Sequence, residues 1–494
     1  MPGVSILLAV CGAAALADPI ALDKTRQLFL DDYLIASMEN VSRVINPAEK
    51  SPANPVLWPQ EPWEGKVAIV YGSVLRDEGK FRMWYHGEAG VSYAESDDGI
   101  AWTKPGLGLY PVDGQDTNTV VKRGAVEGEP NVLPHFYELF GVHRDERATD
   151  PDRRYVMGFL SIQREYEGPN EDPFHKGERR GLGVAASPDG IHWTLRENFA
   201  TDAICDGGTY WMLDPAREAY VLYGRTKHVP EGLLNAWGED EWVKKSFWGR
   251  AVARVQSPDF FEWDFTAPAT APIVMTPDGK DKPGTEIYSL QVFPYEGIYI
   301  GLVQVFHNQA DACHLDIQLA VSRDGAAFSR VGNRAPFIPV GPVGSWDRFN
   351  TSVANNPPVA VNDELRFYYG GRTYRHSPYA GPDKGTSGGG IGFASIQRDR
   401  FVSLEASFDG GVIETVPVEL TGTTIHVNAA TRFGTIEVEV LDTQTRIPVA
   451  VALAAQEDAL DIPLAWNEGA APAKGPYILR ITLRNAGLYA LWCE

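Results

Sequence analysis

The sequence predicts an all-β protein, a five-bladed β-propeller followed by a small C-terminal β-sandwich. Three observations lead to this prediction. A turn built around Ser and Asp recurs five times, the segments between the turns consist of short strand-like runs, and no long amphipathic helix is visible along the 494 residues. The serines that open the turns stand 65 to 91 residues apart. A repeat of this length that contains only strands is typical of propeller blades.

The five turns share a Ser, an Asp and a following aromatic residue. They are Ser96–Trp102, Ser187–Trp193, Ser257–Trp263, Ser322–Phe328 and a degenerate copy, Ser395–Phe401. Asp-Gly forms hairpin turns, because Gly accepts a positive φ and Asp caps its own backbone. We therefore expect the turn acids to shape the turns rather than to catalyse, and the aromatic residues to pack between neighbouring sheets.

Each turn follows two strand-like runs. The first runs are Phe81–His86, Tyr155–Leu160, Tyr220–Tyr223, Ile298–Val303 and Leu365–Tyr369. The second runs are Val91–Ala94, Gly183–Ala186, Ala251–Val255, Ile317–Val321 and Gly390–Ala394. One strand before each pair and one after the turn complete four strands, which make one blade. A β-sandwich with recurrent hairpins is the alternative.

The repeat stops near residue 404, which predicts a propeller over residues 18–404 and a β-sandwich over residues 405–494. The expected sandwich strands are Val412–Leu420, Thr424–Asn428, Thr435–Leu441, Pro448–Leu453, Tyr477–Leu483 and Leu488–Trp492. A structural role and a carbohydrate-binding role are both open for this second domain.

Residues 1–17 are predicted to be a signal peptide, because Val4–Leu16 is apolar or small and Ala15-Leu16-Ala17 forms a small-x-small cleavage site. The protein is therefore expected to be secreted or periplasmic. No later run is long enough to span a bilayer. The formal charge of −21 opposes binding to nucleic acid and to anionic membranes, so neither is expected as a partner.

The order of signal peptide, five blades and C-terminal sandwich resembles the invertase-like glycoside hydrolases and the wider set of levansucrase- and arabinanase-type propellers. The likeness covers nearly all of the mature chain. Segments that resemble secreted relatives of this superfamily are Leu28–Ile35, Asn54–Leu57 with Pro62–Glu64, Thr285–Tyr288 with Gln291–Gly297, and Glu364–Gly371. The Asn-Asp-Pro-Asn, Arg-Asp-Pro and Glu-Cys motifs of invertases are not intact here, so fructose as substrate is not implied.

The resemblance implies a secreted glycoside hydrolase that acts on an oligo- or polysaccharide through paired carboxyl groups in the propeller funnel. A non-catalytic glycan-binding propeller is the alternative, and a scaffold that docks proteins is a third hypothesis. Neither a Gly-x-Ser-x-Gly elbow, a phosphate-binding Gly-x-x-x-x-Gly-Lys-Ser/Thr loop nor a His-Glu-x-x-His motif is present in the sequence. The sequence therefore offers no motif for these other chemistries.

Glycoside hydrolysis generally needs one protonated and one ionised carboxyl group. The acids near the five expected innermost strands are Glu64, Glu129, Asp206, Glu286 and Asp347. We expect Glu286 to be the general acid, because it precedes an apolar strand and lies on the same face as Tyr288. Asp206 is the expected base or nucleophile, because two glycines follow it and allow a ligand close to the backbone. Asp347 is expected to orient or tune the pair. A turn cap or a solvated rim residue is the alternative for each acid.

Sugar recognition requires flat aromatic rings and polar donors. The expected substrate-binding residues are Glu64, Tyr71, Glu129, Trp211, Tyr288, His307, Trp346 and Arg372. Packing between blades is the alternative for the aromatic residues, and salt bridges to surface acids are the alternative for Arg372.

His307 and His314 form the densest histidine cluster, with Asp311 and Cys313 between them. This spacing suits either a metal site or a loop between two strands of the fourth blade. The loop is preferred, with His307 bonded to substrate, so no metal ligands are expected. No cofactor is expected either, although the resemblance leaves a calcium ion on the propeller axis open.

Overall fold

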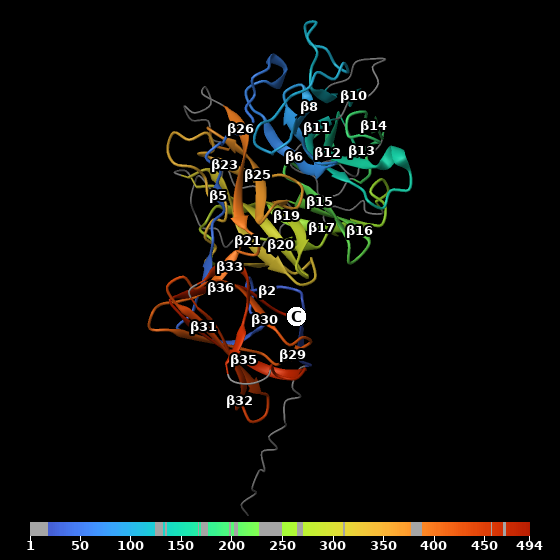
Figure 1. Cartoon of the computed structure of the whole chain (residues 1–494). Helices are drawn as coiled ribbons and strands as arrows, with labels where there is room; N and C mark the ends of the chain where they lie inside the picture. Colours follow the sequence, from blue (N-terminus) through green and yellow to red (C-terminus); the bar gives the residue numbers. More distant parts are fainter. Residues whose placement is uncertain are drawn as a thin grey trace, which may run out of the picture. The chain divides into compact units, whose positions relative to one another are not determined.

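The structure is a computed structural model, and it shows an all-β protein, as predicted (Figure 1). It describes residues 18–123, 132–133, 136–165, 167–168, 176–196, 199–201, 206–226, 249–263, 270–309, 312–376, 388–455, 457–467 and 471–494. The helical segments with described bounds are two short 3₁₀ turns, Pro62–Glu64 and Pro151–Arg153. The predicted signal peptide and Glu129 lie outside the described residues.

The chain divides into two compact units, and residues 45–401 form the larger one. Its strands fall into five successive groups with antiparallel ladders. The first group contains β6 (Ile69–Asp77), β7 (Lys80–Gly87), β8 (Gly90–Ser96) and β9 (Thr119–Arg123), with β10 (Val132–Leu133) beside β9. The second contains β11 (Phe136–Arg144), β12 (Tyr155–Arg164), β13 (Glu178–Ser187) and β14 (Thr194–Leu195). The third contains β15 (Tyr210–Asp214), β16 (Ala219–Thr226), β17 (Ala251–Ser257) and β18 (Ile273–Met275).

The last two groups are joined through one parallel bridge between β21 and β23. The fourth group contains β19 (Thr285–Tyr295), β20 (Ile298–His307), β21 (His314–Ser322) and β22 (Ser329–Arg330). The fifth contains β23 (Asn350–Val353), β25 (Glu364–Arg372), β26 (Gly389–Gln397) and β5 (Glu49–Lys50), with β24 (Val359–Val361) on β25. The ten strand-like runs predicted before the turns all lie within strands of these groups.

The five groups close into a ring. The first strand of each group contacts that of the next along β6, β11, β15 and β19, while β23 contacts both β20 and β6. The fifth group is completed by a strand from the start of this unit, because Lys50 of β5 pairs with Ala394 of β26. The first strands therefore lie together on the inside, although they are far apart in sequence.

The predicted Ser/Asp turns join neighbouring groups. Asp98 Oδ1 accepts hydrogen bonds from the backbone amides of Ile100 (2.7 Å) and Ala101 (2.9 Å), and Asp189 and Asp324 repeat this pattern. The glycine carbonyl of a turn then accepts a hydrogen bond from an aromatic side chain of the preceding group. These bonds run from Trp84 to Gly190 (2.6 Å), from Tyr223 to Gly325 (2.7 Å) and from Tyr368 to Gly99 (2.8 Å). The prediction that these acids are turn formers is confirmed.

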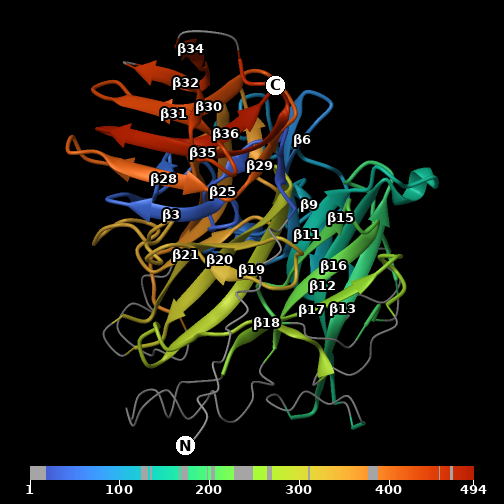
Figure 2. The same cartoon turned by 90° about the horizontal axis from the view of Figure 1, so that it is seen from below.

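The smaller unit consists of residues 402–494 together with the N-terminal segment up to residue 44. One sheet has the order β1 (Ile20–Leu22), β29 (Val418–Leu420), β35 (Gly475–Arg484), β31 (Thr435–Asp442), β32 (Pro448–Ala455) and β34 (Ala465–Asn467). In Figure 2 its strand β35 lies beside β28 (Gly411–Thr415), which in turn pairs with β3 (Ile35–Glu39). The second sheet contains β33 (Asp458–Pro463), β30 (Ile425–Ala430), β36 (Ala486–Cys493), β27 (Val402–Ala406) and β4 (Ser42–Ile45), with β2 (Gln27–Leu28) on β36.

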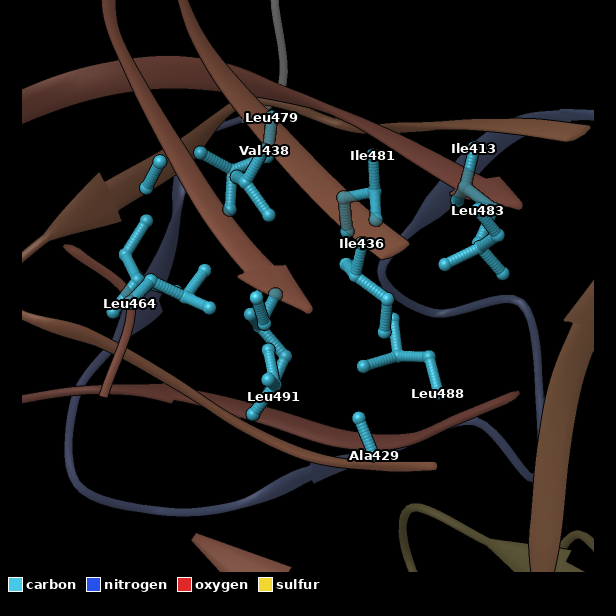
Figure 3. Close-up of a cluster of buried hydrophobic side chains, with 14 of the residues drawn as sticks. Ile413, Ala429, Ile436, Val438, Leu464, Leu479, Ile481, Leu483, Leu488 and Leu491 are labelled. Carbon is cyan, nitrogen blue, oxygen red and sulfur yellow. The ribbon is translucent and has the colours of Figure 1, made fainter. Parts of the chain in front are cut away.

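The two sheets of the smaller unit enclose one apolar core. Figure 3 shows Ile436 of β31 and Ile481 of β35 facing Leu488 and Leu491 of β36, and all four side chains are fully buried. Burial of each such side chain stabilises the fold by about 1.5–3 kcal/mol. Along β31, buried residues largely alternate with half-buried ones, as expected for a strand that packs one face against a core.

The larger unit ends at residue 401, close to the predicted boundary at residue 404, but it starts at residue 45 and not at the predicted residue 18. Residues 18–44 belong with the C-terminal strands, because β1 pairs with β29 and β3 pairs with β28. The ladder hydrogen bonds of these short N-terminal strands are thus made with segments almost 400 residues away, which no local sequence pattern reveals. Among the described residues, no helix has the length and apolar character needed to cross a membrane.

Candidate functional site

The innermost strands of the larger unit carry their polar and aromatic side chains near their N-terminal ends. These residues are Tyr71 on β6, Glu138 on β11, Tyr210 on β15, Tyr288 on β19 and Asn350 on β23. Three of the strands change register there, between Ile69 and Ser73, between Phe136 and Glu138, and between Ile287 and Ser289. A β-bulge re-aims the side chain beside it, and bulges are frequent next to active sites.

Further along the inner strands, the segment Val353–Asn356 fills the space between the groups. Asn355 donates its backbone N–H to the Gly72 carbonyl (2.7 Å), and Asn356 accepts a bond from the Val74 amide (2.8 Å). Gln291 of β19 donates to the Asn356 carbonyl (3.1 Å). The segment thereby links the inner strands of the first and fourth groups.

Glu138 is the carboxyl group whose surroundings most favour its neutral form. Burial raises the pKa of Glu138 to about 7, and the negative charge of Asp206 contributes to this increase. Among the described residues, none donates a hydrogen bond to this carboxyl group. A partly exposed carboxyl group that titrates near neutral pH is suited to general acid catalysis.

Asp206 lies beside Glu138 as an ion-paired carboxylate. Its Oδ2 is 3.2 Å from a guanidinium nitrogen of Arg225, and its Oδ1 is 3.4 Å from one of Arg180. The glycines after Asp206 are predicted to allow a close approach to the backbone. In the structure the Glu138 carboxyl group makes this approach, because a Cβ on Gly207 would lie only 2.2 Å from Glu138 Oε2. Gly207 also donates its amide to Asp206 Oδ1 (2.9 Å), so the nearest oxygens of the two carboxyl groups are at most about 8 Å apart.

Two tyrosines and two arginines complete this cluster, and three of these residues, Tyr71, Tyr288 and Arg372, are predicted substrate-binding residues. The Arg225 guanidinium lies 3.7 Å from the ring centre of Tyr288, and Arg372 lies 5.8 Å from that of Tyr71. The charges of both arginines act on Glu138 and lower its pKa, which offsets part of the effect of burial. Tyr71 interacts electrostatically with Glu138 as well. The structure thus brings Asp206, Tyr71, Tyr288 and Arg372 together.

Glu286, the predicted general acid, is fully buried and bound within the protein. Its Oε2 lies 2.5 Å from a guanidinium nitrogen of Arg250 and 3.2 Å from the Asn308 amide nitrogen. Its Oε1 accepts the Arg250 backbone N–H at 3.1 Å. Both oxygens are therefore engaged within the protein, and the Arg250 guanidinium forms an ion pair with this carboxyl group. The catalytic role of Glu286 stays a prediction, and this geometry does not favour it over Glu138.

Asp347 and Glu64 are also held in buried networks. Asp347 Oδ2 is 2.5 Å from the Lys50 ammonium and 2.9 Å from the Tyr369 hydroxyl. Glu64 accepts hydrogen bonds from Lys104 (2.7 Å) and from the Tyr85 hydroxyl. Burial acts to raise the pKa of Glu64, but these bonds and two from backbone amides outweigh it and lower the pKa. Neither residue is placed in the cluster around Gly207, so their predicted roles in tuning and substrate binding gain no support.

Trp211 and Trp346 occupy packing positions. Trp211 is buried between the rings of His143 (3.9 Å) and Phe260 (4.2 Å), in the core shared by the second and third groups. Trp346 stacks on Tyr369 at 5.4 Å, next to the Asp347 network. Trp211 therefore packs between neighbouring strand groups, the alternative to substrate binding, because rings cover both of its faces. Trp346 packs against another ring with one face.

His307, predicted to bind substrate, is placed in a cluster with His314 and Asp316. One donor atom from each of the three residues lies within 4.8 Å of the others, so together they could hold a metal ion. Burial lowers the pKa of His314 to about 4, and the charge of His307 contributes to the decrease. Asp311 lies outside the described residues, and the Cys313 sulfur is bonded to the His376 carbonyl (3.3 Å).

Glu138 is the candidate site residue that the sequence analysis missed. The acid expected for the second group was Glu129, chosen from the segment before the inner strand. The signal that could have revealed Glu138 is a carboxyl group inside an apolar strand, Phe136–Arg144, next to Leu139 and Phe140.

Comparisons with known proteins give structural likeness only. No family model and no curated protein sequence matches the chain. An N-acetylgalactosamine deacetylase from F. plautii, solved with blood group B trisaccharide, has a TM-score of 0.43 at 14% identity, with 78% of this chain and 96% of that chain covered. A family 32 β-fructofuranosidase of Bombyx mori has a TM-score of 0.43 at 11% identity, with 90% and 95% covered.

A family 43 arabinoxylan arabinofuranohydrolase from Bacillus subtilis, solved with cellotetraose, has a TM-score of 0.38 at 12% identity, with 90% of this chain and 98% of that chain covered. A fructofuranosidase and an arabinofuranohydrolase are thus among the matched structures. Similarity at this level leaves the function of the chain to be argued from its own residues.

Proposed function

We propose that this chain is a secreted or periplasmic glycoside hydrolase that acts on an oligo- or polysaccharide, with Glu138 as general acid and Asp206 as the partner carboxylate. In this proposal the five groups of residues 45–401 are the blades of a five-bladed propeller, and the two sheets of the smaller unit form a β-sandwich. The closed ring of inner strands and the hydrogen bonds between neighbouring groups support the blade arrangement.

The observation that carries the proposal is the pair of carboxyl groups on either side of Gly207. Glu138 has a pKa of about 7, so a large fraction is protonated near neutral pH, while Asp206 is paired with Arg180 and Arg225. Glycosidases need this division of labour, because one group donates a proton to the leaving oxygen and the other must be negative. The upper limit of about 8 Å on the distance between their oxygens is compatible with either mechanism. Retaining enzymes have a separation of about 5–5.5 Å, and inverting enzymes one of about 6.5–9.5 Å.

The reaction would begin with a sugar placed over the ends of the inner strands. Glu138 would give its proton to the glycosidic oxygen as the bond breaks. Asp206 would act on the opposite side of the anomeric carbon, either as nucleophile or as the base that activates water. Burial, together with the charge of Asp206, raises the pKa of Glu138, so that its carboxyl group holds a proton which it can donate near neutral pH.

The neighbouring side chains suit sugar recognition. Arg372 offers hydrogen-bond donors to a sugar, and the buried rings of Tyr71 and Tyr288 line the cluster behind it. Arg225 forms an ion pair with Asp206 and is stacked on Tyr288. These two contacts fix the position of the Arg225 guanidinium. These residues are predicted to contribute to substrate affinity more than to the chemical step.

The test is a glycan panel assayed with wild type, Glu138→Gln, Asp206→Asn and Glu286→Gln. We expect wild type to release sugar and the first two variants to lose at least about 100-fold in kcat, since general acid catalysis alone contributes about 10² to 10⁴. The matched control is Glu146→Gln, an exposed glutamate in the loop after β11, which should keep wild-type activity. Activity in Glu138→Gln but not in Glu286→Gln would return the acid role to Glu286. Binding of glycan by wild type without any hydrolysis would support the non-catalytic alternative.

A further inference from the structure

We propose that His307, His314 and Asp316 form a binding site for a divalent transition-metal ion, with zinc as the best-fitting ion. This site is separate from the two carboxyl groups beside Gly207, and the proposal does not depend on glycosidase activity.

The three residues lie on one face of a β-hairpin. His307 is the last residue of β20 and His314 is the first residue of β21, and the two are direct cross-strand partners. Asp316 follows two residues later, and residues two apart on a strand point to the same side of the sheet. The hairpin therefore places all three side chains together through its register alone.

The distances match a shared ion. His307 Nε2 is 3.0 Å from Asp316 Oδ2, and His314 Nε2 is 4.0 Å from the same oxygen. The two imidazole rings are stacked with centres 4.5 Å apart and planes inclined by 23°. Ligand atoms at about 2.0–2.2 Å from a tetrahedral zinc ion are roughly 3.3 Å from each other. Movements of under about one ångström would bring the three donors to that geometry.

The donor set points to a transition metal rather than to calcium. Two imidazole nitrogens and one carboxylate oxygen suit zinc, cobalt and nickel, whereas calcium and magnesium prefer oxygen ligands. Metal-binding histidines act as neutral ligands, and both rings here present a nitrogen to Asp316. A structural hydrogen bond to Asp316 would require only His307. It would not explain why the ring of His314 is stacked on that of His307.

The groups around the cluster hold the donors in orientation. Gln318 donates to Asp316 Oδ1 at 3.4 Å, which leaves Oδ2 directed at the histidines. Gln318 is itself bonded by Arg330, and the His314 ring makes a hydrogen bond with the backbone of Ala312. Contacts of this kind, which fix the ring and carboxylate orientation, are found behind the ligands of most protein metal sites.

The cluster also has an accessible side. The side chains of His307 and His314 are 22% and 23% exposed, while that of Asp316 is 6% exposed. Three protein ligands with solvent access leave at least one coordination position free, as in zinc sites that bind water or an oxygen of another molecule. His307 pairs with Thr285 at the start of β19, so the ion would lie at the same end of the fourth group as Tyr288.

The experiment uses the tag-free mature chain after treatment with a chelator. Zinc chloride and cobalt chloride are titrated separately by calorimetry, and the cobalt complex is also followed by its visible absorption. We expect one equivalent of each ion to bind with micromolar or tighter affinity, and the thermal unfolding temperature to rise with zinc. His307→Gln, His314→Gln and Asp316→Asn should each weaken binding at least 30-fold.

The control is His192→Gln, which removes an exposed histidine that is paired with Asp189 at 2.7 Å and belongs to no group of three possible metal ligands among the described residues. This variant should bind the ions as wild type does. Circular dichroism of each variant without metal shows whether it folds, and the three single variants provide independent readings if one does not. Absence of stoichiometric binding to wild type, or equal binding by folded His307→Gln and wild type, would overturn the proposal.

Discussion

Replacement of Glu138 by Gln should stabilise the protein, and the gain should grow with pH. Glutamine imitates the neutral carboxyl group in size and polarity but cannot ionise. The folded protein raises the pKa of Glu138 from its ordinary value of 4.5 to about 7, chiefly through burial. Between these two values the unfolded chain releases a proton that the folded chain retains, so wild type loses stability as the pH rises.

The magnitude follows from the two pKa values. Each pKa unit corresponds to about 1.4 kcal/mol, so ionising Glu138 in the folded state costs up to about 3 kcal/mol above pH 7. The same relation gives a cost of only about 1 kcal/mol at pH 5, where most molecules of folded protein still hold the proton. The difference in unfolding free energy between Glu138→Gln and wild type should therefore increase by about 2 kcal/mol from pH 5 to pH 8.

Urea unfolding followed by tryptophan fluorescence measures this difference, since eleven of the thirteen tryptophans lie within residues 45–401. Glu146→Gln, at an exposed position, is the control and should show the same small change at both pH values. An effect of Glu138→Gln that is equal at pH 5 and pH 8 would show that Glu138 titrates at its ordinary value, and the assignment of Glu138 as the acid would then fail.

Three further outcomes follow from the same geometry. Asp206→Asn removes the charge that helps to raise the pKa of Glu138, so the rise in stability of Glu138→Gln with pH should become smaller in the Asp206→Asn background, measured by the same urea titrations. Gly207→Ala should lower glycan hydrolysis at least about 10-fold, because its Cβ would meet Glu138 Oε2 at 2.2 Å, whereas Gly279→Ala has open space and should retain wild-type activity in the same assay. Glu286→Gln should reduce the urea unfolding free energy by about 3–5 kcal/mol, because it leaves a buried arginine without its counter-charge; a loss below 1 kcal/mol would contradict that account.

The strand groups of residues 45–401 could be predicted from the sequence because their signals are local. The turn at Ser96–Trp102 and its copies specify hairpins through Asp-Gly chemistry, and apolar runs flank them on both sides. The placement of residues 18–44 could not be predicted, because β1 and β3 are short strands whose partners lie near the other end of the chain. A short strand has no periodicity of its own, and only the partner fixes its register.

The site was predictable in part for a related reason. Asp206 could be predicted because an acid followed by two glycines is a local pattern. Tyr288 could be predicted because it lies in an apolar strand, two residues after Glu286. Whether a buried acid is neutral or ionised depends on which cation faces it across the ring, and that information is distributed over several groups. Arg250, remote in sequence from Glu286, decides that Glu286 is ion-paired.

The arrangement of charges explains why one acid of the inner strands differs from the others. Arg225 and Arg250 lie 3.7 Å and 5.6 Å from the ring centre of Tyr288, and each arginine pairs with a different carboxylate, Asp206 and Glu286 respectively. The charges of Asp206 and Glu286 are thereby neutralised by arginines in direct contact. Glu138 interacts with its arginines only at longer range, and the negative charge of Asp206 lies beside it. A proton is then the counter-charge that Glu138 can acquire most easily, and a proton held by an acid next to a fixed carboxylate is what cleavage of a glycosidic bond requires.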